Sequence, residues 1–317
     1  MVMAQSLFIS LKKQNPGVII DVVSPEWSLP LLSRMPEINQ AIALPVKHKQ
    51  LALFTRYQVG KQLRKHQYDQ AIVIPRSFKS ALVPYFAGAT RRTGYKGEMR
   101  YGLLNDIHPL DKSVLTQTVQ RYVALGQNSD IESTPVIPEP RLRVDEQNMQ
   151  NVLNKLGLKT DKPIIGIMPG AEYGPAKQWP YYKELAQKLV SLNYYVWVFG
   201  SEKDQHFGND IVNGLEDNAI NLCGKTSLVD AVDLIPVTEK VVSNDSGLMH
   251  IACATGTEVI AIYGSSTPDY TPPLSAKAKV LYRNLPCSPC FKRICPYGHT
   301  DCLKNIDTDS VLNAIGC

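Results

Sequence analysis

The residues best suited to chemistry lie in segment 244–250, whose sequence is NDSGLMH and which follows an apolar run. Asp245 or Ser246 suits the N-cap of the helix predicted over 246–255, and Gly247 would let a ligand approach the backbone closely. Free amides at a helix start favour phosphate, and His250 one turn later could donate to the same anion. An ordinary capped helix accounts for the same residues, so both interpretations stay open here.

A second candidate is the loop 169–180, PGAEYGPAKQWP, which joins an apolar run to a helix with Pro180 near its first turn. Open α/β sheets bind ligands at the carboxyl ends of their parallel strands, which is where this loop would lie. Lys177 could neutralise a diphosphate at that position. The alternative is that Lys177 is a solvated loop lysine and that Trp179 anchors the loop in the core.

A third candidate is segment 200–204, GSEKD, because an acid just past a strand of this kind often accepts hydrogen bonds from ribose hydroxyls. Glu202 or Asp204 could serve, although two acids in a polar loop are commonplace. Two better-known motifs are excluded. Segment 224–226, GKT, resembles the end of a P-loop, but Ala219 stands where the motif requires glycine. Neither G-x-G-x-x-G nor G-x-S-x-G occurs.

Four of the seven cysteines fall within 287–302, together with His299. Cys287 and Cys290 have the spacing of a zinc-binding pair, but Cys295 and Cys302 are too far apart for a standard second pair. A structural loop with unbound thiols explains the segment as well as a metal site does, so no metal is assigned. In a reducing compartment these cysteines would not form disulfides.

The elements that must position these segments alternate between strand and helix. Apolar runs typical of buried parallel strands occur at 18–23, 70–74, 164–168, 195–199, 240–243 and 259–263. Helical patterns lie between them at 49–66, 180–192, 227–235 and 246–255. This alternation predicts an α/β protein with parallel sheets.

Length and composition indicate two globular domains. The 317 residues are 44% hydrophobic and 20% charged, and the proline-rich stretch 128–140 reads as a linker. We therefore predict domains at 1–135 and 136–317. The net charge of +5 is too mild for a typical nucleic-acid binder. The sequence contains no apolar run of about 18 residues and no signal peptide, which predicts a cytoplasmic protein.

The first residues depart from the expected pattern. Segment 1–13 has helical spacing, whereas a doubly wound domain normally opens with a strand in the middle of its sheet. Either the fold begins with a helix, or an earlier strand is missing; the residues themselves favour neither explanation.

Four segments, in this order and spacing, resemble the heptosyltransferase II branch of glycosyltransferase family 9. They are PGAEYGPAKQWP, NDSGLMH, YGSSTPDYTPP and CSPCFKRICPYGHTDC. The resemblance covers almost the whole chain and includes segment 74–100, IPRSFKSALVPYFAGATRRTGYKGEMR. The cysteine-rich segment is the most specific part, because the heptosyltransferase I branch does not share it in this form.

This resemblance implies the GT-B architecture, two facing Rossmann-like domains with parallel sheets. The first domain would be the acceptor side, and the second would bind the nucleotide sugar and carry the cysteine-rich segment 287–302. The implied reaction is an inverting transfer of L-glycero-D-manno-heptose from ADP-heptose to the first heptose of the lipopolysaccharide inner core, without cofactor or metal. The lipid A-linked acceptor implies work at the cytoplasmic face of the inner membrane, in peripheral contact with it.

The resemblance also implies roles for individual residues. Lys177 would hold the diphosphate, Asp245 would hold heptose hydroxyls, and both would support catalysis. Phosphate would meet the amides of Ser246, Gly247 and Leu248 and the side chain of His250; Glu202 or Asp204 would take ribose, and the backbone near Thr226 would receive adenine. Cationic side chains of the first domain would face the anionic acceptor: Arg76, Lys79, Arg91, Arg92, Lys96 and Arg100. Each of these taken singly is also explained as a solvated surface charge.

The chain departs from the family at its front. Relatives begin with a strand and a loop ending in Gly-Asp, and that Asp, the family's proposed general base, would sit immediately before Met1. A protein that truly lacked this strand would be expected to be poorly soluble and inactive, because neighbouring strands would lose their ladder partner. Two alternatives therefore stay open, a non-catalytic nucleotide-sugar-binding protein and a heptosyltransferase with a different core acceptor.

Overall fold

The computed structural model describes residues 1–47, 50–127 and 133–317. The chain divides into two compact units, which comprise Met3–Pro138 and Glu139–Cys317. The predicted boundary fell between residues 135 and 136. Both units are α/β in character, and every paired strand in them runs parallel to its neighbour. The α/β class with parallel sheets is therefore confirmed.

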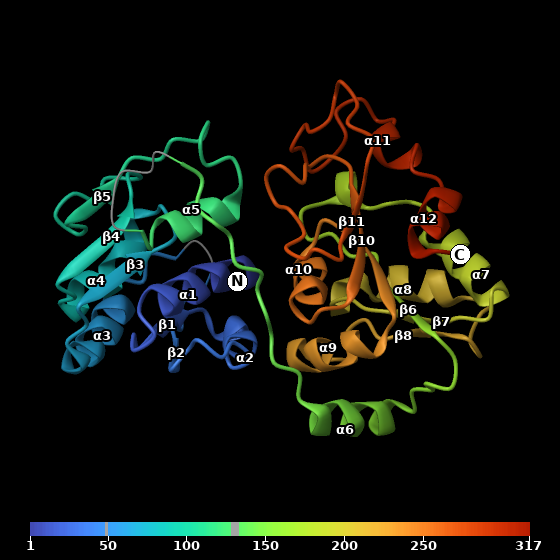
Figure 1. Cartoon of the computed structure of the whole chain (residues 1–317), viewed down its shortest axis with the longest axis horizontal. Helices are drawn as coiled ribbons and strands as arrows, with labels where there is room; N and C mark the ends of the chain where they lie inside the picture. The colour runs from blue at the N-terminus through green and yellow to red at the C-terminus, as the bar shows by residue number, and fades with distance from the viewer. Residues whose placement is uncertain (48–49, 128–132) are drawn as a thin grey trace. The chain divides into compact units, whose positions relative to one another are not determined.

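The second unit is built on one six-stranded sheet (Figure 1). Its strands are β6 (Ile164–Met168), β7 (Tyr195–Val198), β8 (Ala219–Asn221), β9 (Lys240–Asn244), β10 (Glu258–Tyr263) and β11 (Lys279–Tyr282), in the order β11-β10-β9-β6-β7-β8. Every residue of β6 and β7 is buried, which explains why their sequences are apolar without alternation. The chain builds the sheet outward from β6 in one direction and then, from β9, in the other.

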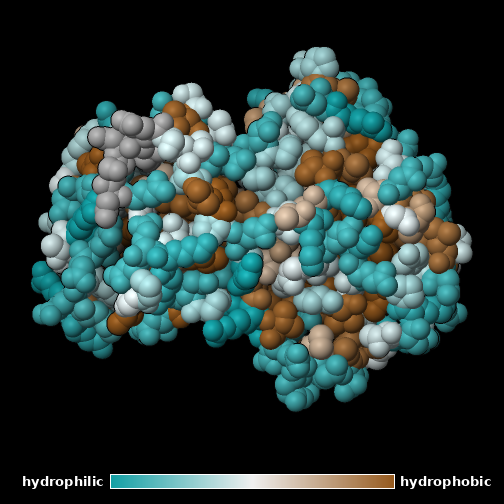
Figure 2. All heavy atoms as spheres, in the orientation of Figure 1, coloured by the Kyte–Doolittle hydropathy of each residue, from teal (hydrophilic) through white to brown (hydrophobic). Residues whose placement is uncertain are grey.

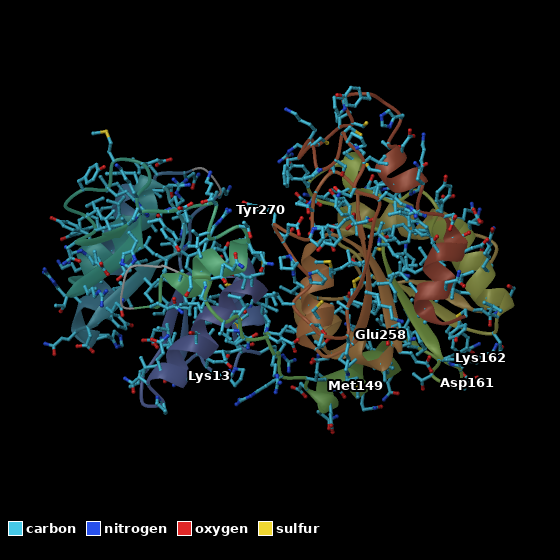
Figure 3. All side chains as sticks on the ribbon, turned by 45° about the horizontal axis from the view of Figure 1, so that its top comes forward. Lys13, Met149, Asp161, Lys162, Glu258 and Tyr270 are labelled. Atoms are coloured by element: carbon cyan, nitrogen blue, oxygen red, sulfur yellow. The ribbon has the colours of Figure 1, made fainter. Side chains whose placement is uncertain are left out.

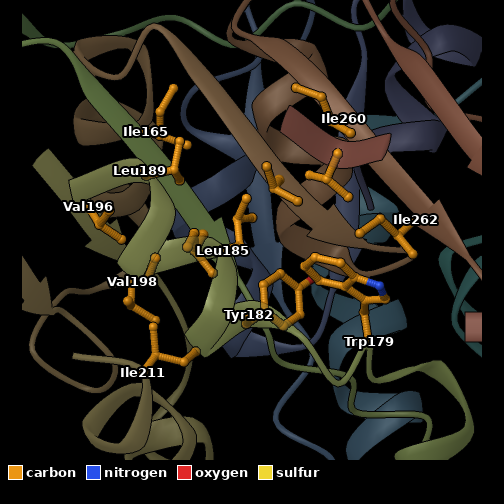
Figure 4. Packing of buried hydrophobic residues seen from close by; sticks show 14 of the residues in the cluster. Ile165, Trp179, Tyr182, Leu185, Leu189, Val196, Val198, Ile211, Ile260 and Ile262 are labelled. Atoms are coloured by element: carbon orange, nitrogen blue, oxygen red, sulfur yellow. The ribbon is translucent and has the colours of Figure 1, made fainter. Parts of the chain in front are cut away.

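Helices cover this sheet and close its core. They are α6 (Glu146–Leu156), α7 (Tyr182–Ser191), α8 (Gln205–Val212), α9 (Leu228–Leu234), α10 (Gly247–Ala254), α11 (Asp301–Lys304) and α12 (Thr308–Ile315). Figure 4 shows Leu185 and Leu189 of α7 packed over Ile165, with Trp179 edge-on to Tyr182 at a ring separation of 5.1 Å. Because Trp179 stands at the α7 end of the loop between β6 and α7, this packing anchors that end of the loop.

The first unit contains two smaller sheets. Strands β1 (Asp21–Ser24) and β2 (Gln40–Ala43) form one pair, and β3 (Gln70–Val73), β4 (Arg91–Tyr95) and β5 (Asp106–His108) form a three-stranded sheet in that order. Its helices are α1 (Val2–Gln14), α2 (Leu29–Leu32), α3 (Leu53–Leu63), α4 (Leu82–Ala87) and α5 (Thr118–Ala124). Helix α1 confirms the helical spacing at the front of the sequence.

The two ends of the large sheet are chemically different. Glu258 at the amino end of β10 forms ion pairs with Lys240 and Lys279, at 3.3 and 3.1 Å. In Figure 3 this end, marked by Glu258, lies away from Tyr270, which follows the carboxyl end of β10. The candidate segments of the sequence all follow strands at the carboxyl end.

The drawn face of the molecule carries mainly hydrophilic side chains (Figure 2). Among the described residues, no helix is long and apolar enough to cross a bilayer.

Candidate active site

The candidate site lies where the order of strands reverses in the large sheet. Strands β6 and β9 are hydrogen-bonded neighbours with Met168 opposite Ser243, although about 70 residues separate them in the chain. From these two strands the chain continues toward opposite edges of the sheet, and this reversal is the point at which open α/β sheets bind ligands. The loop after β6 carries Lys177, and the loop after β9 carries Asp245.

Lys177 and Asp245 form an ion pair across this point. The Lys177 amine lies 2.5 Å from Oδ2 of Asp245, and the two side chains are only 16% and 6% exposed. Asp245 also accepts hydrogen bonds from the hydroxyls of Ser266, at 2.6 Å, and Thr271, at 3.3 Å. Three donors, from the loop after β6 and the segment after β10, therefore converge on the Asp245 carboxylate.

The residue before Asp245 holds the two loops together. The Asn244 side-chain amide donates to the carbonyl of Pro169 at 2.8 Å and accepts from the backbone N–H of Trp179 at 3.1 Å. The Trp179 indole N–H in turn donates to the carbonyl of Ile306 at 2.7 Å. Trp179 is thus the core anchor that one reading of the sequence expected, and it fixes the loop end next to Lys177.

The helix after Asp245 begins as the sequence predicts. Ser246 is the N-cap of α10, and its hydroxyl accepts a hydrogen bond from the backbone N–H of Met249 at 3.4 Å. A Cβ added at Gly247 would meet nothing within 4 Å, so open space lies beside the first turn, with Leu248 half-buried after it. The amides of this turn remain able to meet an anion.

His250 lies one turn into α10 and is buried. Its Nδ1 atom has no hydrogen-bond partner among the described residues. Burial lowers the pKa of His250 to about 4, although the negative charge of Asp245 acts in the opposite direction. The imidazole is therefore neutral at pH 7, and either ring nitrogen can carry its single proton.

The loops after β7 and β8 are joined by a hydrogen bond from the Gly224 N–H to the Gly200 carbonyl, at 3.1 Å. Asp204 accepts from the N–H and the hydroxyl of Ser201, at 2.8 and 2.7 Å, so its carboxylate caps the turn that it belongs to. Glu202 is exposed, and Thr226 is half-buried in the next loop. Of the two candidate acids, Asp204 is occupied by its contacts with Ser201, whereas the exposed Glu202 carboxylate is accessible to a ligand.

An aromatic contact connects Lys177 with the cysteine-rich segment. The Lys177 amine lies 5.1 Å from the centre of the Tyr173 ring, and the Arg293 guanidinium lies 5.4 Å from the same ring. The Tyr173 hydroxyl donates to the carbonyl of Phe291 at 2.6 Å. Segment 287–302 therefore supports the loop that carries Lys177.

The cysteines of this segment surround a small hollow. It is lined by Cys287, Cys290, Cys295, Cys302 and His299, among others. In the part of the chain that the structure describes, no three His, Cys, Asp or Glu side chains are arranged to hold a metal ion. Hydrogen bonds from backbone amides, the first from Thr300, lower the pKa of Cys295, whereas burial raises that of Cys302.

The six basic residues predicted to face an acceptor lie in the first unit and fall into two groups. Arg91 pairs with Asp106 at 2.7 Å, and Arg92 donates to the carbonyls of Leu103 and Ala89. Arg100 is 2% exposed and donates to the carbonyls of Pro75 and Tyr95. Its burial differs from the surface position expected from the sequence, because it holds a loop in place.

The remaining three basic residues are better placed for a solute. Arg76 and Lys96 are exposed, and Lys79 is half-exposed. The Nε and Nη2 atoms of Arg76 donate to the backbone carbonyl of Lys96, at 3.3 and 3.2 Å. The loops that carry Arg76 and Lys96 are therefore in contact. Among the described residues, the amines of Lys79 and Lys96 form no ion pair.

Sequence reasoning did not single out Ser266, Thr271 or Tyr173. Ser266 and Thr271 belong to the hydroxyl-rich stretch 265–271, SSTPDYT, directly after β10. Hydroxyls at the carboxyl end of a predicted strand are a usable signal, because that end of the sheet is where ligands bind. Tyr173 gave no local signal, since its role depends on contacts with residues more than 100 positions away.

The chain matches known proteins over most of its length. The profile of Glycosyltransferase family 9 (heptosyltransferase) matches residues 56–301. Lipopolysaccharide heptosyltransferase 2 of Escherichia coli is 48% identical over 292 residues, which cover 89% of this chain and 84% of the relative. Lipooligosaccharide heptosyltransferase 2 of Haemophilus influenzae is 47% identical over 295 residues, with the same coverage. The solved structure of E. coli ADP-heptose lps heptosyltransferase II superposes with a TM-score of 0.87 at 43% identity, covering 100% of this chain and 94% of that one.

Proposed function

This chain belongs to glycosyltransferase family 9 (heptosyltransferase), and we propose that it transfers L-glycero-D-manno-heptose from ADP-heptose to the first heptose of the lipopolysaccharide inner core. The observation that carries the proposal is the Lys177–Asp245 pair at the strand reversal of the second unit. It combines a cation for a diphosphate with a carboxylate for sugar hydroxyls at the position where sheets of this kind bind nucleotides.

In this proposal, the contacts between Lys177 and Asp245 are replaced by contacts with bound ADP-heptose. The diphosphate of ADP-heptose takes the Lys177 amine, and the heptose hydroxyls donate to Asp245, which Ser266 keeps in place. The first-turn amides of α10 and an N–H of neutral His250 donate to phosphate oxygens. Exposed Glu202 accepts from the ribose hydroxyls, and the backbone near Thr226 lies beside adenine.

The reaction is a displacement at the anomeric carbon. A hydroxyl of the acceptor heptose forms the new C–O bond and releases its proton to water, while the bond from the anomeric carbon to the β-phosphate oxygen of ADP breaks with inversion and ADP leaves with the electron pair. Lys177 and the amides of α10 stabilise the negative charge that grows on the leaving diphosphate. Because these groups are already held by Asn244 and Ser246, little reorganisation accompanies the step.

The first unit supplies the acceptor side in this proposal. Arg76, Lys79 and Lys96 offer accessible cations to the phosphates and carboxylates of an inner core. Arg91, Arg92 and Arg100 are not assigned to the acceptor, because they form the contacts within the first unit described above. Since the acceptor is linked to lipid A, we place the enzyme at the cytoplasmic face of the inner membrane.

A transfer assay tests the function. The purified protein is incubated with ADP-heptose and a lipid-free core oligosaccharide that ends in one heptose, and product is detected by mass. We expect addition of one heptose with release of one ADP per product. An oligosaccharide without the terminal heptose is the matched control and should not be extended. Equal extension of both acceptors would reject the acceptor assignment, and ADP-heptose binding without product would reject the transferase.

A further inference from the structure

Helices α3 and α4 of the first unit present exposed aromatic side chains that the donor site does not use. Phe54 is 70% exposed, Tyr57 40% and Tyr85 45%. Single exposed apolar residues are ordinary on a protein surface, whereas a contiguous group of them marks an interaction site.

These side chains form one continuous strip. The rings of Tyr57 and Phe86 meet edge to face at 5.1 Å, and those of Phe86 and Tyr85 lie 5.5 Å apart. Phe54 precedes Tyr57 by three positions on α3, which places both on the same side of the helix. We call these four residues, together with Lys61 and Arg92, the α3–α4 strip.

Cations lie over two rings of the aromatic row. The Lys61 amine is 5.8 Å from the centre of the Tyr57 ring, and the Arg92 guanidinium is 5.8 Å from the centre of the Tyr85 ring. Arg64 and Lys65 follow Lys61 along the same chain segment and are exposed. The strip therefore combines aromatic surface with positive charge.

The rings stay on the surface because the helices leave no room between them. A Cβ on Gly60 would lie 2.5 Å from the Phe86 Cβ and 2.8 Å from the Val83 carbonyl oxygen, so α3 and α4 are already in contact there. Val59 and Leu63 occupy the buried side of α3. The aromatic side chains consequently have no core to enter.

The sequence segment that contains the strip is strongly basic. Residues 38–97 contain eleven Lys and Arg but only one acid, Asp69, which gives +10 for this segment. Because the whole chain carries +5, the other residues sum to −5. The positive charge of the protein is thus concentrated in the segment that builds the strip.

We infer that the α3–α4 strip binds the surface of an anionic lipid bilayer. Aromatic rings with polar or cationic neighbours settle at the headgroup level, and Lys and Arg beside them meet lipid phosphates. An apolar protein partner would fit the exposed rings but would not account for the charge of segment 38–97. The inference rests on the proposed function, since it brings the enzyme to the surface where a lipid-linked acceptor lies.

Vesicle co-sedimentation tests this directly. The full chain is mixed with vesicles of phosphatidylglycerol and phosphatidylcholine in equal amounts, and with phosphatidylcholine vesicles alone. We expect binding to the mixed vesicles that weakens with salt and little binding to the neutral ones. The Phe54→Ser/Tyr57→Ser and Lys61→Gln/Lys65→Gln variants should each reduce the partition coefficient roughly tenfold or more. Absence of binding, or equal binding to both vesicles, would overturn the inference.

Matched variants separate the strip from general charge and from the reaction. Lys112→Gln/Lys159→Gln removes the same charge from exposed positions elsewhere, and Tyr297→Ser removes a ring that is 68% exposed. Both should bind vesicles like the natural chain; if they lose binding equally, the strip is not the site. The strip variants should extend the lipid-free acceptor at the normal rate. If neither the natural chain nor any variant transfers heptose, but only the strip variants lose vesicle binding, the proposed function is rejected and the membrane-binding inference is supported.

Discussion

The amine of Lys177 and the carboxylate of Asp245, 68 positions apart in the chain, meet at 2.5 Å across the strand reversal of the second unit. In this arrangement each charge neutralises the other. Under the proposed function, a diphosphate would compete for the lysine and sugar hydroxyls would compete for the aspartate, so binding would replace one set of charge-assisted contacts with another. The hydroxyls of Ser266 and Thr271 donate to this carboxylate and would keep it oriented during that exchange.

Replacing Lys177 with alanine should weaken ADP-heptose binding and slow transfer. A charge-assisted hydrogen bond contributes about 1.5–3 kcal/mol, so kcat/KM should fall roughly 10- to 100-fold. Steady-state kinetics at saturating acceptor measure the loss. Lys203→Ala is the control, because Lys203 is 76% exposed and pairs only with exposed Glu172. Unchanged kinetics for Lys177→Ala would remove this lysine from the site.

The stability of the protein should fall as the pH is lowered from about 6.5 to about 4. The folded-state pKa of His250 is lowered to about 4 by burial, while the unfolded chain takes up this proton near the ordinary value of 6.5. Between those values the unfolded state binds more protons, so acid favours unfolding by up to about 1.4 kcal/mol per pH unit. Chemical denaturation at several pH values measures the slope. His250→Gln should flatten it, and an identical slope in that variant would contradict the assignment.

Gly60→Ala should destabilise the first unit. The added Cβ would lie 2.8 Å from the Val83 carbonyl oxygen, which is backbone and cannot rotate away, so the helices must separate. Overpacking of this kind costs about 1–3 kcal/mol, measurable as a shift in thermal or denaturant unfolding. Gly247→Ala provides the comparison, because its Cβ would meet nothing within 4 Å and should leave the free energy of unfolding within about 0.5 kcal/mol. Equal stability of the two variants would refute the close packing of α3 and α4.

Cys295 should be alkylated faster than Cys302. Backbone hydrogen bonds lower the pKa of the Cys295 thiol, whereas burial raises that of Cys302, which is 9% exposed. Since the thiolate is the reactive form, short exposure to iodoacetamide near pH 7.5 should label Cys295 first. Peptide mass mapping over time gives the order. Earlier labelling of Cys302 would show that this segment opens in solution.

The elements that a local pattern can reveal were found from the sequence. The predicted strands 164–168 and 240–243 correspond to β6 (Ile164–Met168) and β9 (Lys240–Asn244), because fully buried strands require uninterrupted apolar residues. The predicted helix 246–255 begins with Ser246 as its N-cap. This could be predicted because capping depends on a hydrogen bond between residues only three positions apart. Strand β4 (Arg91–Tyr95) was missed, since its two arginines make it look like exposed, acceptor-facing surface.

The sequence by itself determined the α/β class, the parallel strands of the second unit and the loops that carry Lys177, Asp245 and Glu202, because each depends on residues that are close in the chain. Only the tertiary structure decided that β6 and β9 are neighbours, that Ser266 and Thr271 reach Asp245, and that Arg100 is buried. Strand order and burial result from packing between distant segments, and no local periodicity records which strand will lie beside which.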